Sequence, residues 1–246
     1  MTLSKPILKY GFADDLKALG WIMLVVLGIN IFLGVVSVGN TNINGLEYIF
    51  GLILLIGYAG YFEESLHFFI QHGVSRRTIS VSTTVSMVIS SLLFTIAVMV
   101  TTGLLALFAA VAPVDTSYLS VFSTFYTQQL AGMGAVQGVL VHFVWTWATL
   151  LAFGAVGEFG ASFYYILSKL GRYIALGVII FVVVLLPRFL IPMLGDLEAM
   201  IEAFVNIIIY GGDWGNPFTA IAVTLGVATA CLIGSWLCVR RCKMKK

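Results

Sequence analysis

Long apolar runs separated by short polar segments dominate the pattern of the chain. A bilayer core about 30 Å thick needs about 20 apolar residues at 1.5 Å of helix rise per residue. Six runs come close to that length or exceed it, and they cover residues 21–38, 46–62, 81–112, 135–156, 173–192 and 218–239. Because a spanning segment must satisfy its own backbone hydrogen bonds, each run is predicted to be a transmembrane helix.

Three segments outside these runs carry apolar residues on one face of a helix. The stretch ILKYGFADDLKALG, residues 7–20, mixes them with lysines and aspartates and predicts a helix lying in the membrane interface. The other two segments lie in the connections after the third and fifth runs, where apolar residues recur every three or four positions. Their members are Tyr118, Val121, Phe122, Phe125 and Tyr126 in the first, and Leu197, Met200, Ile201, Phe204, Val205 and Ile208 in the second. We expect amphipathic outer-loop helices that either cap the mouth of the bundle or rest on lipid headgroups.

Composition supports the membrane assignment. Of the 246 residues, 60% are apolar and 10% are charged, whereas about a quarter are charged in soluble domains. With no visible repeat or soluble domain, residues 1–246 are predicted to form one all-α, polytopic membrane domain. The first run is predicted to be a retained span, because Asp14 and Asp15 precede it and no small-x-small cleavage pattern follows it. The three cysteines have neither metal-site nor disulfide spacing.

The basic residues sort to one side of the predicted membrane. Six spans place both termini on the same side, and twelve of the thirteen lysines and arginines then fall there. These are Lys5, Lys9, Lys17, Arg76, Arg77, Lys169, Arg172, Arg240, Arg241, Lys243, Lys245 and Lys246. The positive-inside rule makes that side cytoplasmic. The exception, Arg188, lies near the outer end of the fifth span, where it snorkels outward, pairs with Asp196 or Glu198, or contacts a substrate.

Single residues also predict helix ends and helix contacts. Asn216 is suited to cap the sixth helix, with Pro217 at the first helical position. Gly134 and Gly138, four residues apart where the fourth span begins, predict a close helix contact.

Ionisable groups, which mark membrane enzymes, are nearly absent from the predicted spans. His142 is the clearest interior candidate, either as a hydrogen-bonded structural residue or as a functional one. Glu63, Glu64 and His67 suggest the paired glutamates of CAAX-type intramembrane proteases, but Phe68 stands where that family has an arginine. The sequence contains neither H-E-x-x-H nor the phosphate loop G-x-x-x-x-G-K-[ST]. We therefore expect no catalytic residue, cofactor or metal in this chain and no ATP hydrolysis by it.

The polar stretch FFIQHGVSRRTIS, residues 68–80, separates the second and third runs. The second helix should continue past its apolar run, end at Gly73 in the left-handed conformation, and be followed by a helix capped by Ser75. Arg76 and Arg77 then fall in the first turn of that helix, where the macrodipole disfavours cations. Compensation is expected from lipid phosphates, from Glu63 and Glu64, or from an acidic groove on a partner.

This arrangement resembles the permease subunits of type-2 ATP-binding-cassette (ABC) exporters, particularly those that handle peptides and antibiotics in Gram-positive bacteria. Members often carry a G-[VL]-S-R-[KR]-T element here, and residues 73–78 match it throughout. The stretch GEFGASFYYILSKLGRY, residues 157–173, is similar to the basic connection between spans four and five of that family.

The resemblance implies that residues 63–80 form a coupling helix region that docks on a separate ATPase subunit, which would hold ATP and Mg. The implied contacts are Glu63, Glu64, His67, Gln71, Gly73, Val74, Ser75, Arg76, Arg77 and Thr78, with a second cytoplasmic contact at Glu158, Lys169 and Arg172. It also implies a second permease chain, identical or related, and a multi-pass location in the bacterial plasma membrane. No nucleic acid partner is expected.

The sequence thus predicts an ABC exporter permease that moves an amphipathic peptide, an antibiotic or a lipid-like compound. Two alternatives stay open at this point. One is a membrane immunity or sensor subunit that binds such a compound without transporting it, and the other is an intramembrane hydrolase.

Overall fold

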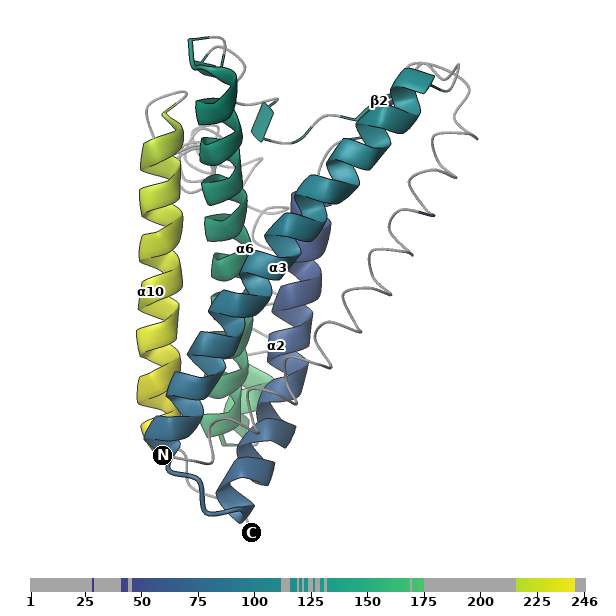
Figure 1. Cartoon of the computed structure of the whole chain (residues 1–246). Coiled ribbons are helices and arrows are strands. Elements are labelled where there is room, and N and C mark those ends of the chain that lie inside the picture. Colours follow the sequence, from purple (N-terminus) through teal and green to yellow (C-terminus); the bar gives the residue numbers. More distant parts are fainter. Residues whose placement is uncertain are drawn as a thin grey trace, which may run out of the picture.

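Four long helices dominate the computed structural model (Figure 1). The residues described are 28, 41–43, 46–111, 116–118, 120, 122–123, 126, 129–130, 132–168, 170–174 and 216–241. The helices are α2 (Leu46–Gln71), α3 (Arg76–Val111), α6 (Ala135–Ile166) and α10 (Pro217–Arg241). By length and composition each of the four could cross a membrane.

These helices correspond to the predicted runs at 46–62, 81–112, 135–156 and 218–239. The prediction that the second helix continues past its apolar run is confirmed, because α2 extends to Gln71. The prediction for α6 was too short, since this helix continues ten residues beyond Val156 to Ile166. Several predictions fall outside the described residues: the spans 21–38 and 173–192, the interfacial segment 7–20, the outer-loop segment 197–208, and Lys169 and Arg188. Within the two spans, only residue 28 and residues 173–174 are described.

Two three-residue strands accompany the helices. Strand β1 (Thr41–Ile43) pairs in parallel with β2 (Thr116–Tyr118), so the segment before α2 lies beside the segment after α3. Tyr118 was predicted to be helical and instead belongs to β2, because its backbone pairs with Ile43. Helical hydrogen bonds do follow, from Tyr126 N to Phe122 O at 3.0 Å and from Leu130 N to Tyr126 O at 2.9 Å.

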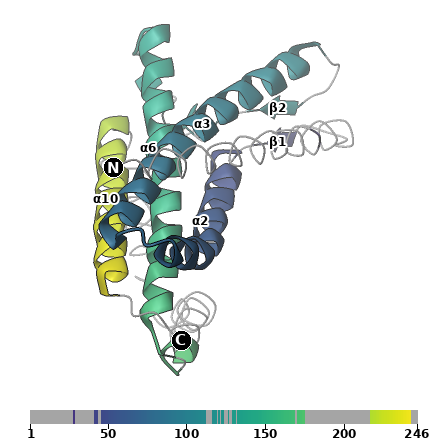
Figure 2. The ribbon, with the colours of Figure 1, turned by 60° about the horizontal axis from the view of Figure 1, so that its bottom comes forward.

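Helix α6 occupies the middle of the bundle, with α2 on one flank and α10 on the other, while α3 crosses obliquely (Figures 1 and 2). The foot of α3 lies beside the end of α10, and its other end leans away from α6. We call the end that carries the α2–α3 connection the turn end and the opposite one the far end. Buried apolar clusters lie at both ends and between them, for example around Phe62, Met87 and Trp145.

The close contacts among the four long helices are made by different glycines from those predicted. A Cβ atom on Gly157 of α6 would overlap the carbonyl oxygen of Leu55 in α2 and lie 3.0 Å from the carbonyl carbon, so only glycine allows this approach. Within the described part of the chain, no atom lies within 4 Å of the position that a Cβ atom would take at Gly134, and at Gly138 only the Leu130 side chain does, at 3.1 Å. The four long helices therefore make no close backbone contact at Gly134 or Gly138, and a contact with the predicted spans 21–38 or 173–192 stays a prediction.

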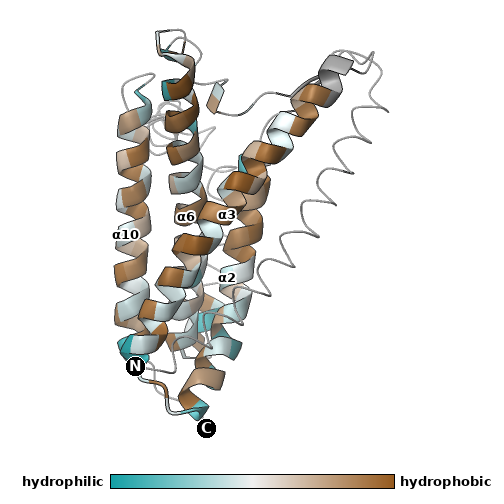
Figure 3. Cartoon of the chain, viewed as in Figure 1, coloured by the Kyte–Doolittle hydropathy of each residue, from teal (hydrophilic) through white to brown (hydrophobic). Residues whose placement is uncertain are grey.

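Hydrophobic residues predominate along the four long helices (Figure 3), and many of their side chains are exposed on the outside of the bundle. Large exposed examples are spread along every long helix, among them Ile56 on α2, Leu107 on α3, Val136 on α6 and Ile233 on α10. In water such a surface would be strongly unfavourable, whereas lipid tails solvate it. The fold therefore supports a membrane protein.

Candidate functional sites

The connection between α2 and α3 is a sharp turn held by backbone hydrogen bonds. Gly73 has a φ of +72°, in the left-handed region predicted for it. The Gly73 amide donates to the carbonyl of Ile70 at 3.0 Å, and the Val74 amide donates to that of Phe69 at 3.0 Å. This pair of bonds is the Schellman motif, which satisfies carbonyls left without partners at the end of a helix.

The next helix starts with the predicted cap. The backbone amide of Thr78 donates to Ser75 Oγ at 3.2 Å, and the two hydroxyl groups lie 2.7 Å apart. Helix α3 begins at Arg76, and its first intrahelical bond runs from Ile79 N to Ser75 O at 3.0 Å. Only Val74, whose amide belongs to the Schellman motif, lies between Gly73 and the N-cap residue Ser75. The turn therefore has little conformational freedom.

A buried apolar cluster fixes this turn to the rest of the bundle. Its buried members are Phe62, Leu66, Ile79, Tyr165 and Val239, drawn from all four long helices, and Val74 and Phe69 pack against them. His67 Nε2 also lies 3.2 Å from the Tyr165 hydroxyl, a contact between α2 and α6. A displacement of the turn would therefore move α2 and α3 together and would also shift the side chains of α6 and α10 that pack in this cluster.

The structure brings the predicted coupling residues together at the turn end. Exposed members are Glu63, Glu64, Gln71, Gly73, Ser75, Arg76 and Arg77, and half-buried members are His67, Val74 and Thr78. His67 and Val74 contact the core described above, whereas the exposed residues present a mixed-charge edge. The turn thus has a buried side that anchors it and a polar side that faces outward.

Arg76 finds a different partner from the acids considered for it. Its Nη1 donates a hydrogen bond of 2.9 Å to the carbonyl oxygen of Arg240, in the last turn of α10. Within the described part of the chain, neither Arg76 nor Arg77 forms an ion pair with Glu63 or Glu64, so this one of the three candidate sources of compensation is not used here. Carbonyls at a helix C-terminus lack intrahelical partners and carry partial negative charge, and they can take the place of a carboxylate.

The second predicted cytoplasmic contact is only partly at the surface. Glu158 is 3% exposed within α6 and accepts a hydrogen bond of 2.9 Å from Ser235 Oγ of α10. It was expected in an exposed connection, but α6 continues past it and α10 covers it. Arg172 folds back on the end of α6, with Nη2 3.4 Å from the Tyr165 carbonyl and its guanidinium 4.9 Å from the centre of the Tyr164 ring.

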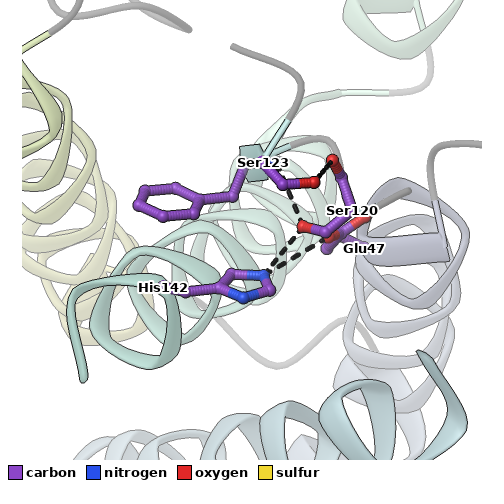
Figure 4. Close-up of polar contacts among 5 residues, drawn as sticks. Glu47, Ser120, Ser123 and His142 are labelled. Carbon is purple, nitrogen blue, oxygen red and sulfur yellow. Dashed lines mark hydrogen bonds and ion pairs between the residues drawn. The ribbon is translucent and has the colours of Figure 1, made fainter. Parts of the chain in front are cut away.

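At the far end, a buried polar cluster joins three separate segments (Figure 4). Ser120 Oγ donates to Glu47 Oε1 at 2.5 Å and lies 2.8 Å from His142 Nε2. His142 Nε2 is itself 3.7 Å from Glu47 Oε1. Glu47 is 1% exposed and His142 is 18% exposed, with the His142 ring stacked on Phe122 at 4.9 Å.

This far-end cluster ties α2 and α6 to the connection that follows β2. Both Ser120 and Glu47 approach the same imidazole nitrogen, so the carboxylate does not orient the ring through Nδ1 as a hydrolase triad requires. The hydrogen bond expected of a structural histidine is therefore present at His142. Ser120 was not predicted, and Glu47 was not expected to be a partner of His142, because their positions are far apart in the sequence.

Among the described residues, no group of three or more histidine, cysteine, aspartate or glutamate side chains is placed to hold a metal ion. No protein-family model, curated protein or solved structure matches the chain. The function proposed below therefore rests on the chain's own residues and their geometry.

Proposed function

We propose that this chain is the permease subunit of a type-2 ABC exporter in a bacterial plasma membrane, driven by a separate ATPase subunit. The observation that carries the proposal is the α2–α3 turn. Its Schellman motif and Ser75 cap hold the backbone, and exposed polar residues surround it at the end of two long apolar helices. The element predicted from residues 73–78 thus has the form of a docking point.

A rigid turn suits the transmission of force between subunits. A partner that binds two conformations of the turn with different affinity would shift the equilibrium between them, and only such differential binding can do so. Because Val74, Ile79 and Tyr165 share one buried cluster, a shift of the turn would be passed to α6 as well as to α2 and α3. Packed clusters of this kind transmit displacement better than flexible loops do.

Charges around the turn favour a polar partner surface. Arg77 is exposed and forms no hydrogen bond or ion pair with the described part of the chain, so its guanidinium is available to a carboxylate on another protein. Glu63 and Glu64, also exposed, lie on the last part of α2 before Gly73 and would meet basic groups. Alternating charge of this kind gives register and specificity to an interface more than it gives affinity.

The apolar bundle is suited to transport of an amphipathic or lipid-like compound, with energy supplied by another chain. The sequence carries no phosphate loop, so ATP and Mg would reside on the partner. Pairing with a second permease chain, identical or related, would form the path for an amphipathic peptide, an antibiotic or a lipid-like compound. The role of a sensor or immunity subunit, which binds such a compound without moving it, is the alternative that the experiment must separate.

The test is association with an ATPase. We expect the full-length chain, purified from its native membranes in mild detergent, to carry a subunit that contains a phosphate loop and hydrolyses ATP. Arg77→Glu should greatly reduce this association while membrane insertion stays normal, and Arg76→Glu with Arg77→Glu should abolish it. Arg241→Glu is the matched control, because this arginine is exposed at the same end of the bundle and lies outside the predicted docking element.

Retention of the ATPase by the double variant would overturn the docking assignment. If the wild-type chain carries no ATPase but still binds a cationic amphipathic peptide in the same detergent, the sensor alternative replaces the exporter.

A further inference from the structure

A hollow of about 510 Å³ lies at the turn end, between the start of α3 and the end of α10. Among the residues that the structure describes, five line it: Arg76, Arg77 and Val81 from α3, and Trp236 and Arg240 from α10. The two helix ends lie side by side in both views of the ribbon (Figures 1 and 2). Three of the five lining residues are arginines, which is unusual in a chain with 10% charged residues.

Two of the three arginines of this hollow, Arg76 and Arg240, are held by contacts within the bundle, and the described part of the chain places no acid against any of the three. Arg76 is fixed by its hydrogen bond to the Arg240 carbonyl, and the Arg240 guanidinium lies 5.7 Å from the centre of the Trp236 ring. Within the described ranges, none of the three arginines forms an ion pair with a carboxylate. Convergence of like charges is unfavourable unless an anion joins them, and guanidinium groups bind phosphate oxygens through paired hydrogen bonds.

Beyond the arginines, both helices continue the lining with exposed apolar residues. On α3, Arg77, Val81 and Val85 follow one another at four-residue spacing and are all exposed. On α10, Arg240 and Trp236 are preceded by exposed Ile233, which lies on the same helical face. Each helix therefore presents charge at its end and an apolar stripe along its length.

We propose that this hollow is a binding site for the phosphate headgroup of an anionic phospholipid, whose acyl chain lies along the apolar stripes. Trp236 is suited to the headgroup level, since tryptophan concentrates at membrane interfaces. Clusters of arginine next to a span attract anionic lipids. A soluble phosphate compound would use the arginines but would gain nothing from Val81, Val85 or Ile233. The lipid is therefore the occupant that accounts for both parts of the site.

Arg76 and Arg77 also belong to the proposed ATPase contact, so lipid binding is tested in the absence of any other protein and through Arg240, which lies outside residues 63–80. The full-length chain is purified in a neutral detergent, and bound phosphatidylglycerol is measured by native mass spectrometry, with phosphatidylcholine as the zwitterionic reference. We expect phosphatidylglycerol to bind and phosphatidylcholine to bind much more weakly. Arg240→Gln should lower the phosphatidylglycerol affinity about fivefold, the effect of about one basic residue near an anionic lipid.

Arg241→Gln is the matched control, because Arg241 is the next residue on the same helix and does not line the hollow. Equal effects of Arg240→Gln and Arg241→Gln would overturn the site in favour of a diffuse charge effect.

Val81→Asn tests the apolar part and should weaken phosphatidylglycerol binding while leaving binding of inorganic phosphate unchanged. Two results together would instead assign the hollow to a soluble phosphate compound. Low millimolar inorganic phosphate would displace phosphatidylglycerol, and Val81→Asn would leave phosphatidylglycerol binding unchanged. Unfolding curves of each variant show whether a loss of binding reflects a loss of fold.

Discussion

Gly157 of α6 packs directly against the backbone carbonyl of Leu55 in α2, so closely that a Cβ atom at position 157 would overlap the carbonyl oxygen. Backbone atoms cannot rotate away as a flexible side chain can. This contact therefore helps to set the distance between α2 and α6. In lipid, where association of helices depends on close packing, small residues at such points have a large effect.

Replacement of Gly157 by alanine should destabilise the chain. The added methyl group forces α2 and α6 apart, and overpacking of this kind costs about 1–3 kcal/mol. The measurement is the unfolding free energy of the purified chain in detergent. Gly160→Ala is the control, since no described residue lies within 4 Å of a Cβ atom there, and it should be neutral or slightly stabilising. A Gly157→Ala chain as stable as the Gly160→Ala chain would show that the close approach is not structurally important.

The buried Glu158 and Ser235 pair should respond asymmetrically to substitution. Ser235→Ala removes the hydrogen bond to a carboxylate that is 3% exposed, and an unsatisfied buried group of this kind costs about 1–3 kcal/mol. Glu158→Gln should cost less, because the amide oxygen still accepts from Ser235. The double change Glu158→Leu with Ser235→Ala should be less harmful than Ser235→Ala alone, since no polar group is then left without a partner. Unfolding measurements on all three variants test this, and a double variant that is less stable than Ser235→Ala alone would contradict it.

Local chemistry in the sequence was enough to predict the long helices and their caps. Apolar runs of sufficient length located α2, α3, α6 and α10. Gly73 and Ser75 marked the turn because few residues suit a left-handed C-terminus or an N-cap, and both assignments are confirmed. The same holds for Asn216, whose Oδ1 accepts from Phe218 N at 3.1 Å where α10 begins at Pro217.

Contacts between distant segments could not be predicted in this way. Ser120 and Glu47 are 73 residues apart, and nothing near either residue in the sequence specifies the other. Arg76 is 164 residues from Arg240, and the acceptor is a backbone carbonyl, which every residue has. Among the four long helices, the choice of glycines failed for the same reason, because a four-residue glycine spacing says nothing about which helix will face it. Pairings of this type depend on how the helices pack.

The far-end cluster should be sensitive to the loss of Ser120. The Ser120 hydroxyl is the link between Glu47 Oε1 and His142 Nε2, so Ser120→Ala leaves a carboxylate that is 1% exposed without this donor. We expect a destabilisation of about 1–3 kcal/mol in the unfolding free energy. Glu47→Gln combined with Ser120→Ala should recover part of the loss, because a neutral amide is less costly to bury than a charge. Thr229→Ala, an exposed site whose hydroxyl bonds to its own helix, is the control. Equal stability of Ser120→Ala and the control would show that the cluster does not hold the far end together.

Substitutions of Gly73 should destabilise the chain according to how poorly the new residue tolerates a positive φ. Gly73 has a φ of +72°, and among the residues with described positions none lies within 4 Å of a Cβ atom there, so a substitution changes backbone strain without adding a clash. Gly73→Ala should destabilise the chain by about 1 kcal/mol, because an L-residue enters the left-handed region at that cost. Gly73→Asn should lose less, since asparagine tolerates this conformation. Gly60→Ala, at an equally open position inside α2, should be neutral or stabilising. If strain dominates, the free energy of unfolding in denaturant is highest for the wild-type chain, lower for the Gly73→Asn chain and lowest for the Gly73→Ala chain. Equal losses for the two substitutions would show that the turn relaxes into another conformation.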